Sequence, residues 1–210
     1  LGRCGGPHTG LTLVEQGMDA LLLQAPGRAI CMSTGNYFDE RVHATGNLRP
    51  GQRHTLTWWT NKADITPNEL ECWYSGHDVF AVEVRPPEGN TVFHVPLGGQ
   101  RSLQIDGKEV GRIYHRARDP GKGDNHIDIF LYPGAPAGSW LVTVIGEDVV
   151  DGRFHCWVER DTPCPQCQSR FDPKDAVSSS TTGTICNGFR TIAVGAYNPH
   201  SPDLEMAIFS

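Results

Sequence analysis

A helical spacing of apolar residues marks the start of the chain. The residues that would share one buried face of an amphipathic helix are Leu13, Val14, Gly17, Met18, Leu21 and Leu22. Thr9 or Thr12 can cap the N-terminus of this helix, and Pro26-Gly27 would end it. Residues 28–34 then predict a short buried strand, which closes at Gly35-Asn36.

The pattern changes to short strands in the middle of the chain, roughly residues 45–158. Runs rich in β-branched and aromatic residues, separated by turns, cover residues 54–59, 70–74, 79–84, 110–114, 127–131 and 140–144. Short strands at this spacing predict an antiparallel β-sandwich of jelly-roll type. Alternation along the strands predicts that most of the aromatic side chains, tryptophans included, point into the core. An exposed aromatic platform would instead indicate a sugar- or peptide-binding face.

Residues 159–210 return to a different pattern. A polar connection rich in Ser and Pro covers residues 160–180, and residues 191–197 form an apolar run typical of a buried parallel strand. The outer segments therefore resemble α/β pieces, and the middle is all-β. The simplest topology is a β-sandwich insertion, residues 45–158, between segments 1–44 and 159–210 of an α/β domain.

Composition narrows the classes of partner. The chain carries 18 Lys and Arg against 24 Asp and Glu, and its basic residues are scattered, so we expect no nucleic-acid partner. No apolar run approaches the length of a membrane span, so we expect no membrane partner either. The cysteines number seven, so at least one is free or paired outside this chain, and the compartment stays open.

Two local motifs could hold a metal ion. Cys164-Pro-Gln-Cys167 has the spacing of a zinc knuckle, but there is no second such pair, which favours a local disulfide or free thiols. Residues 119–128 offer oxygen ligands that calcium could use, but without the EF-hand spacing, so a polar turn is favoured. We expect no cofactor. The histidines show no pairwise ligand spacing and predict scattered surface residues.

Three stretches of the outer segments resemble the subtilase family of serine peptidases. Leu1-Gly2, before a Gly-rich segment, is similar to the family's substrate-pairing strand. Residues 30–36 resemble the run that ends at the oxyanion hole, and residues 188–196 with 207–210 resemble the segment before the catalytic serine. The resemblance covers residues 1–44 and about the last 30 residues. The middle resembles a β insertion of some large bacterial subtilases.

This resemblance implies a fold, an activity and a site. The sandwich would be inserted into a subtilisin-like parallel-sheet core of a serine endopeptidase that works through an acyl-enzyme. Asn36 would donate its side-chain amide to the oxyanion. The substrate-binding residues would be Leu1, Gly2, Ser33, Thr34 and Gly35. The Asp, His and Ser of the triad would lie outside this chain, so we expect the fragment alone to be inactive. Its expected partners are a peptide substrate and the remainder of the catalytic domain. The resemblance also favours a secreted or extracytoplasmic location.

Two other interpretations stay open. A stand-alone β-sandwich binding module predicts that Asn36 lies far from any cleft. A pseudoprotease scaffold would lack the triad in the whole protein. Core strands without their parallel neighbours would expose apolar edges, so we also expect the flanking segments to dimerise or to be poorly ordered.

Overall fold

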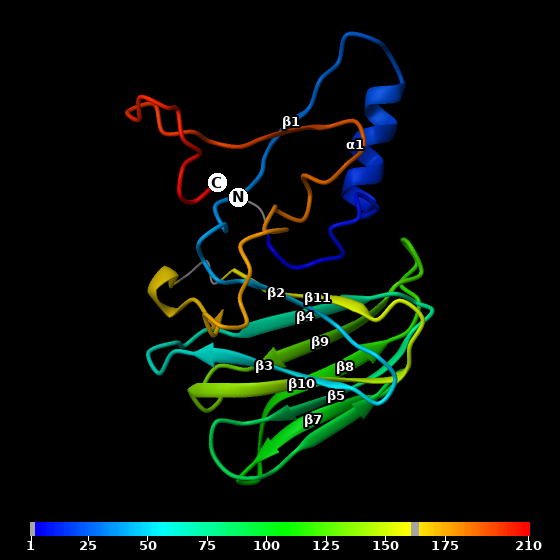
Figure 1. The fold of residues 1–210 in the computed structure, drawn as a ribbon, viewed down its shortest axis with the longest axis vertical. Coiled ribbons are helices and arrows are strands. Elements are labelled where there is room, and N and C mark those ends of the chain that lie inside the picture. Colours follow the sequence, from blue (N-terminus) through cyan, green and yellow to red (C-terminus); the bar gives the residue numbers. More distant parts are fainter. Residues whose placement is uncertain (1–2, 161–163) are drawn as a thin grey trace.

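A computed structural model describes residues 3–160 and 164–210 of the chain (Figure 1). Two antiparallel sheets make up most of it. The six-stranded sheet has the order β2 (His43–Asn47), β11 (Arg153–Val158), β4 (Asn68–Tyr74), β9 (Asn125–Leu131), β8 (Lys108–Arg116), β7 (Gln100–Ile105). The five-stranded sheet has the order β12 (Arg170–Phe171), β3 (Arg53–Thr60), β10 (Gly138–Asp148), β5 (Val79–Arg85), β6 (Phe93–Pro96). The predicted antiparallel sheets are confirmed.

The core lies between these two sheets. In β4, Leu70 and Cys72 are buried toward it, and the intervening Glu71 points to the other face, as the pleat of a strand requires. Trp58 and Trp140 are fully buried, so the prediction of core aromatics is confirmed for them. Trp59 is 40% exposed, which places it on the outer side of its strand.

Strand prediction succeeded where the apolar runs were long. All six predicted runs lie within β3, β4, β5, β8, β9 and β10. The sequence missed β2, β6, β7, β11 and β12. Two of these five, β2 and β7, carry mostly polar residues, and β12 has only two residues, so no apolar run marks them. Tertiary pairing, rather than local pattern, forms such strands.

A smaller part of the chain packs on the other side of the six-stranded sheet (Figure 1). It contains α1 (Leu13–Leu23), β1 (Cys31–Ser33) and β13 (Ile192–Val194). A short 3₁₀ turn, η1 (Pro165–Cys167), lies between β11 and β12. β1 and β13 pair in parallel. The predicted subtilisin-like parallel-sheet core is not evident. Among the described residues, parallel pairing is limited to these two short strands. No helix in the described part is long and apolar enough to cross a membrane.

Helix α1 begins as predicted but packs differently. Thr12 caps it, and Glu15 completes a capping box. The predicted buried apolar face is wrong, because Leu13 is 88% exposed and Glu15 is the buried residue of the helix. The Glu15 carboxylate accepts from the backbone N–H of Asn187 at 2.9 Å, and Asp19 accepts from that of Phe189 at 3.0 Å. Hydrogen bonds to carboxylates thus attach the helix to the C-terminal segment.

The predicted burial of the two parallel strands is also wrong. Ile192 and Val194 of β13 are each 51% exposed, and Cys31 of β1 is exposed. Their parallel pairing was expected, but only one strand lies beside each of them. Both edges and much of the surface of this small sheet therefore remain open within the described residues.

Candidate functional site

Asn36 lies just beyond the end of β1. The backbone N–H of Thr34 donates to Val194 O at 3.1 Å, and the Thr34 carbonyl accepts from the Gly183 N–H at 2.7 Å. The chain then turns at Gly35, whose φ is 104° and where a Cβ would lie 2.9 Å from the Tyr37 ring. Glycine is therefore required at this turn, and the turn leaves Asn36 exposed.

A cavity of about 400 Å³ opens at this point, and we call it the β1 cavity. Its lining residues are Cys31, Met32, Ser33, Thr34, Gly35, Asn36, Val194, Gly195, Ala196 and Ser210. Four of the predicted site residues thus surround one space. Leu1 and Gly2 lie outside the described residues. The lining contains no histidine or carboxylate side chain among the described residues, so it offers no general base.

A larger cavity of about 630 Å³ lies between the N-terminal segment and the outer face of the six-stranded sheet. We call it the His8 groove; its inner lining includes His8, Trp73, His155 and Trp157. The His8 ring stacks on Trp157, with 4.1 Å between ring centroids. The two ring nitrogens of His8 lie 2.9 and 2.8 Å from the carbonyl oxygens of Gly6 and Thr182.

The prediction of scattered surface histidines is wrong. His43, His115 and His126 are buried. His43 Nε2 lies 3.0 Å from His155 Nδ1, because β2 and β11 are neighbouring strands. Burial lowers the pKa of His43 to about 4, and the nearby His155 contributes in the same direction. Burial also lowers the pKa of His8 and of His155, so these rings are uncharged at neutral pH.

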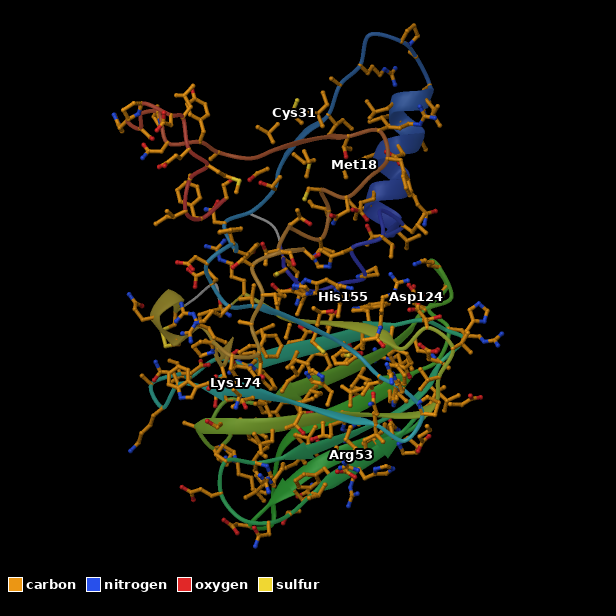
Figure 2. All side chains as sticks on the ribbon, viewed as in Figure 1. Met18, Cys31, Arg53, Asp124, His155 and Lys174 are labelled. Carbon is orange, nitrogen blue, oxygen red and sulfur yellow. A yellow bond between two sulfur atoms is a disulfide. The ribbon has the colours of Figure 1, made fainter. Side chains whose placement is uncertain are left out.

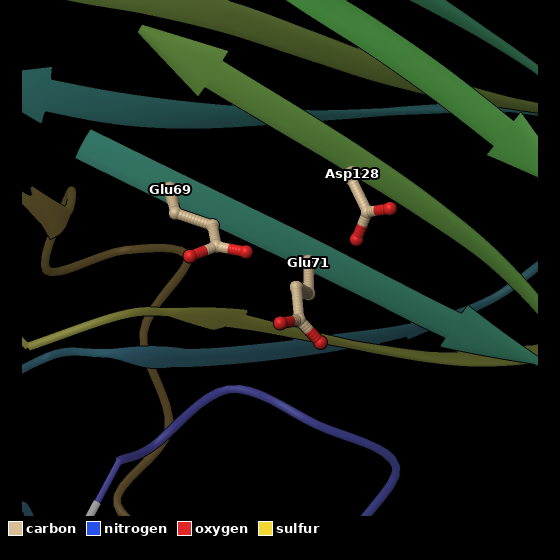
Figure 3. Close-up of side chains that lie close together, drawn as sticks. All are labelled: Glu69, Glu71 and Asp128. Atoms are coloured by element: carbon tan, nitrogen blue, oxygen red, sulfur yellow. The ribbon is translucent and has the colours of Figure 1, made fainter. Parts of the chain in front are cut away.

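Three carboxylates cluster on the same outer face (Figure 3). Oxygen atoms of Glu69, Glu71 and Asp128 all lie within 4.8 Å of one another. Sequence reasoning missed this group, although alternation puts Glu69 and Glu71 on one face of β4. Only the register of β4 against β9 places Asp128 opposite Glu71. Carboxylate oxygens are the ligands that hard cations such as calcium prefer.

Contacts within the protein already engage each of these carboxylates. Glu69 pairs with Arg3 at 2.8 Å, and Asp128 pairs with Arg116. Glu71 accepts from the Gly6 N–H at 2.7 Å. Burial raises the pKa of Glu69 to about 7, with the charge of Glu71 as the second cause. Glu69 and Glu71 therefore anchor the N-terminal segment to the sheet, and the pair of Asp128 with Arg116 lies within the sheet.

The two candidate metal motifs lie in a disulfide and in a turn. Cys164 and Cys167 form a disulfide, one of the two alternatives that the sequence favoured, which removes the thiolates that zinc needs. The other cysteines are free: Cys4, Cys31, Cys72, Cys156 and Cys186. In the turn at 119–128, Asp119 Oδ1 accepts from the Gly121 N–H at 2.9 Å, and Lys122 pairs with Asp124 at 3.5 Å. These contacts are typical of a polar turn.

No protein-family model matches the chain. A purine nucleoside phosphorylase of Bacteroides thetaiotaomicron is 28% identical to it over 134 residues, which cover 58% of this chain and 48% of the relative. This chain therefore spans about half the length of that relative. An identity this low over part of each chain does not establish a shared family.

The solved structure of the Clostridium perfringens CspB protease is similar to the whole chain. The two superpose with a TM-score of 0.81 over 100% of this chain and 43% of the protease chain, at 20% sequence identity. At that identity the similarity shows the fold alone.

These comparisons correct the predicted identification as an internal fragment of the subtilase family. The curated relative is described as a purine nucleoside phosphorylase, which is not a subtilase. The structural match covers the full chain, the middle region included, and not only the outer segments that carry the three motifs. The motifs behind that identification are short, and short motifs alone are weak signals. The chain shares its fold with part of that protease, and no family is established for it.

Proposed function

We propose that the protein containing this chain is a peptidase that hydrolyses peptide bonds through an acyl-enzyme, with Asn36 as an oxyanion donor. The observation that carries the proposal is the β1 cavity, where Ser33, Thr34, Gly35 and Asn36 surround one space. The amide of Asn36 is exposed and has no hydrogen-bond partner among the described residues. It is therefore free to donate to a bound group.

The chemistry follows from the charge that acyl transfer creates. When a nucleophile attacks a peptide carbonyl, negative charge develops on the carbonyl oxygen. A side-chain amide already in place stabilises that charge without reorganising during the reaction. Because the turn at Gly35 fixes the backbone before Asn36, it limits the motion of the donor.

Substrate would bind along the same edge. The side chain before the scissile bond occupies the β1 cavity, with Ser33, Thr34 and Gly35 along its wall. The predicted roles of Leu1 and Gly2 in binding the substrate backbone fall on residues outside the described part of the chain. The nucleophile and the base come from residues that do not line the cavity.

A further part of the protein completes the site. Exposed apolar side chains of the small parallel sheet and of α1, such as Ile192, Val194 and Leu13, offer it a surface to cover. The chain spans 43% of the protease that it resembles in structure. We assign the remainder of the catalytic domain to this surface, with a peptide or protein as substrate.

The test is an activity assay on the complete protein with a peptide anilide substrate. Asn36→Leu lowers kcat by about 10²–10³-fold with little change in KM, since the lost interaction exists only in the transition state. Asn90→Leu, at an exposed turn of the sandwich, is the matched control and keeps wild-type kcat.

Two outcomes would contradict the proposal in different ways. Equal kcat for wild type and Asn36→Leu would remove Asn36 from the site but leave a peptidase. Absence of peptidase activity, together with phosphorolysis of inosine, would favour the activity named for the curated relative.

A second candidate function is a binding role for the sandwich. The His8 groove favours it, because this cavity is larger than the β1 cavity and lies on a sheet face.

A further inference from the structure

Two buried cysteines face each other across neighbouring strands of the six-stranded sheet. Cys72 of β4 is directly opposite Cys156 of β11 in the strand register. Both side chains point into the core, where they are 1% and 0% exposed. Ala44 of β2 and Ile127 of β9, the strand partners on either side of the pair, are also fully buried. The two thiols therefore share a buried apolar environment.

The hydrogen-bond pattern of the two strands brings this pair close together. The backbone N–H of Glu159 donates to Glu69 O at 2.9 Å, so these opposed residues are a hydrogen-bonded pair. Hydrogen-bonded and non-hydrogen-bonded pairs alternate along antiparallel strands. Cys72 is three positions beyond Glu69, so Cys72 and Cys156 form a non-hydrogen-bonded pair. The Cα atoms of such a pair are about 4.5 Å apart, within the range of about 4.4–6.8 Å found in disulfides.

The two thiols also point toward each other. Burial raises the pKa of the Cys156 thiol, and a hydrogen bond between its side chain and that of Cys72 acts in the same direction. Elsewhere in the chain, Cys164 and Cys167 are joined by a disulfide, a bond that persists in oxidising compartments. An environment that maintains that bond would also oxidise a second well-placed pair.

We infer that Cys72 and Cys156 form a cross-strand disulfide that fixes β4 against β11. The outer faces of these two strands carry Trp73, His155 and Trp157 of the His8 groove, so the bond also fixes the strands beneath that groove. This inference does not rest on the proposed peptidase activity.

The bond forms by exchange with a small disulfide such as oxidised glutathione. The thiolate of one cysteine attacks oxidised glutathione and releases one reduced glutathione. The second cysteine then attacks the mixed disulfide and releases another. The two cysteines lose two electrons and two protons, which the two glutathione thiols carry away. Because buried thiols are unreactive, exchange takes place while the sheet is still forming, and folding then shields the bond from reductants.

The test is a refolding experiment on the full chain. The chain is unfolded and reduced, refolded in a mixture of oxidised and reduced glutathione, and then labelled with N-ethylmaleimide under denaturing conditions. Trypsin releases Cys156 in the peptide of residues 154–160 and Cys72 in a separate peptide. We expect mass spectrometry to find these two peptides joined in most of the refolded chains. The Cys164–Cys167 bond lies within one peptide, so it cannot be mistaken for this link.

Two single variants assign the link. Cys72→Ala abolishes it and leaves Cys156 labelled by N-ethylmaleimide. Cys31→Ser is the matched control, because Cys31 is exposed and lies well away from His155 of β11 (Figure 2). This control forms the link to the same extent as the wild-type chain.

A stability measurement checks that the link fixes the two strands. The double variant Cys164→Ser with Cys167→Ser cannot form the local disulfide, so its oxidised and reduced forms differ in the proposed link. The link closes a long loop that runs from β4 to β11. Reduction therefore lowers the melting temperature of this variant by about 10 °C.

Three results would overturn the inference. Complete labelling of Cys72 and Cys156 after refolding in oxidised glutathione would make them two packed core thiols. Links from Cys72 to Cys4 or Cys186 that are as abundant as the link to Cys156 would show unspecific oxidation. A melting temperature of the double variant that is the same before and after reduction would show that no link fixes β4 against β11.

Discussion

Buried histidines are the residues that make this fold sensitive to pH. His115 is 1% exposed, and the Tyr74 hydroxyl lies 2.5 Å from its Nε2 atom. Burial lowers the pKa of His115 to about 4, the same value as for His43. In the unfolded chain both rings would titrate near 6.5. The folded state therefore binds fewer protons than the unfolded state between pH 4 and 6.5.

We predict that the free energy of unfolding falls as the pH drops from 7 to 5. Each of these two histidines contributes about 2 kcal/mol to this loss. The contribution of each uncharged ring to the free energy of unfolding is fully present above pH 6.5 and disappears as the pH falls toward 4. Glu69 acts in the opposite direction, since its pKa of about 7 lies above the unfolded value. It is one partly exposed group and offsets only part of the loss.

Urea unfolding at pH 5, 6 and 7 checks this prediction. His115→Gln, which removes one buried ring, reduces the loss between pH 7 and 5. His200→Gln is the control, because His200 is exposed and leaves the pH dependence unchanged. A free energy of unfolding that stays constant or rises toward pH 5 would contradict the lowered pKa values of His43 and His115.

Turns, at the scale of elements, decide the shape of the His8 groove. The turn after β4 and the turn before β9 lie against each other, since a Cβ on Gly76 would be 1.9 Å from Gly123 O. A side chain at position 76 would force these two turns apart. Gly17 in α1 is the opposite case, because a Cβ there meets no atom within 4 Å.

We predict opposite effects for two glycine-to-alanine changes. Gly76→Ala lowers the free energy of unfolding by about 2 kcal/mol through overpacking against backbone. Gly17→Ala stabilises the helix by about 0.5–1 kcal/mol, because alanine loses less backbone entropy than glycine. Urea unfolding measures the first, and hydrogen exchange of α1 amides measures the second. A neutral Gly76→Ala would contradict the close approach of the two turns.

Apolar side chains are buried unevenly across the molecule. The sandwich buries most of its large apolar side chains between its two sheets, whereas the smaller part leaves Leu13, Ile192 and Ile208 exposed. Exposed apolar side chains beside the open edges of a parallel sheet are unusual in a monomer. The expectation that the flanking segments dimerise or lose order remains a prediction.

We predict that the isolated chain self-associates through this surface at concentrations of tens of micromolar. Leu13→Glu with Ile192→Lys shifts the chain toward monomer, because it places charges on the contact area. Ile65→Lys, at an 80% exposed position on the sandwich, is the matched control and leaves association unchanged. Sedimentation velocity gives the molecular masses. A wild-type chain that remains monomeric would contradict the prediction.

Part of the candidate site could be predicted from the sequence. Residues 33–36 lie next to one another in the chain, so a local motif sufficed to group them, and the β1 cavity does contain them. The His8 groove and the acidic group could not be predicted, because their members come from distant strands. His43 and His155 are 112 residues apart, and only the pairing of β2 with β11 brings them together.

The sequence by itself determined the local elements. Thr12 and Glu15 specify the start of α1 by capping, and alternating apolar residues specify six of the longer strands. Tertiary structure decided the strand register, the turns that approach at Gly76, and which face of α1 is buried. The physical reason is that capping and alternation act within a few residues. Register and burial depend instead on contacts between segments far apart in the chain.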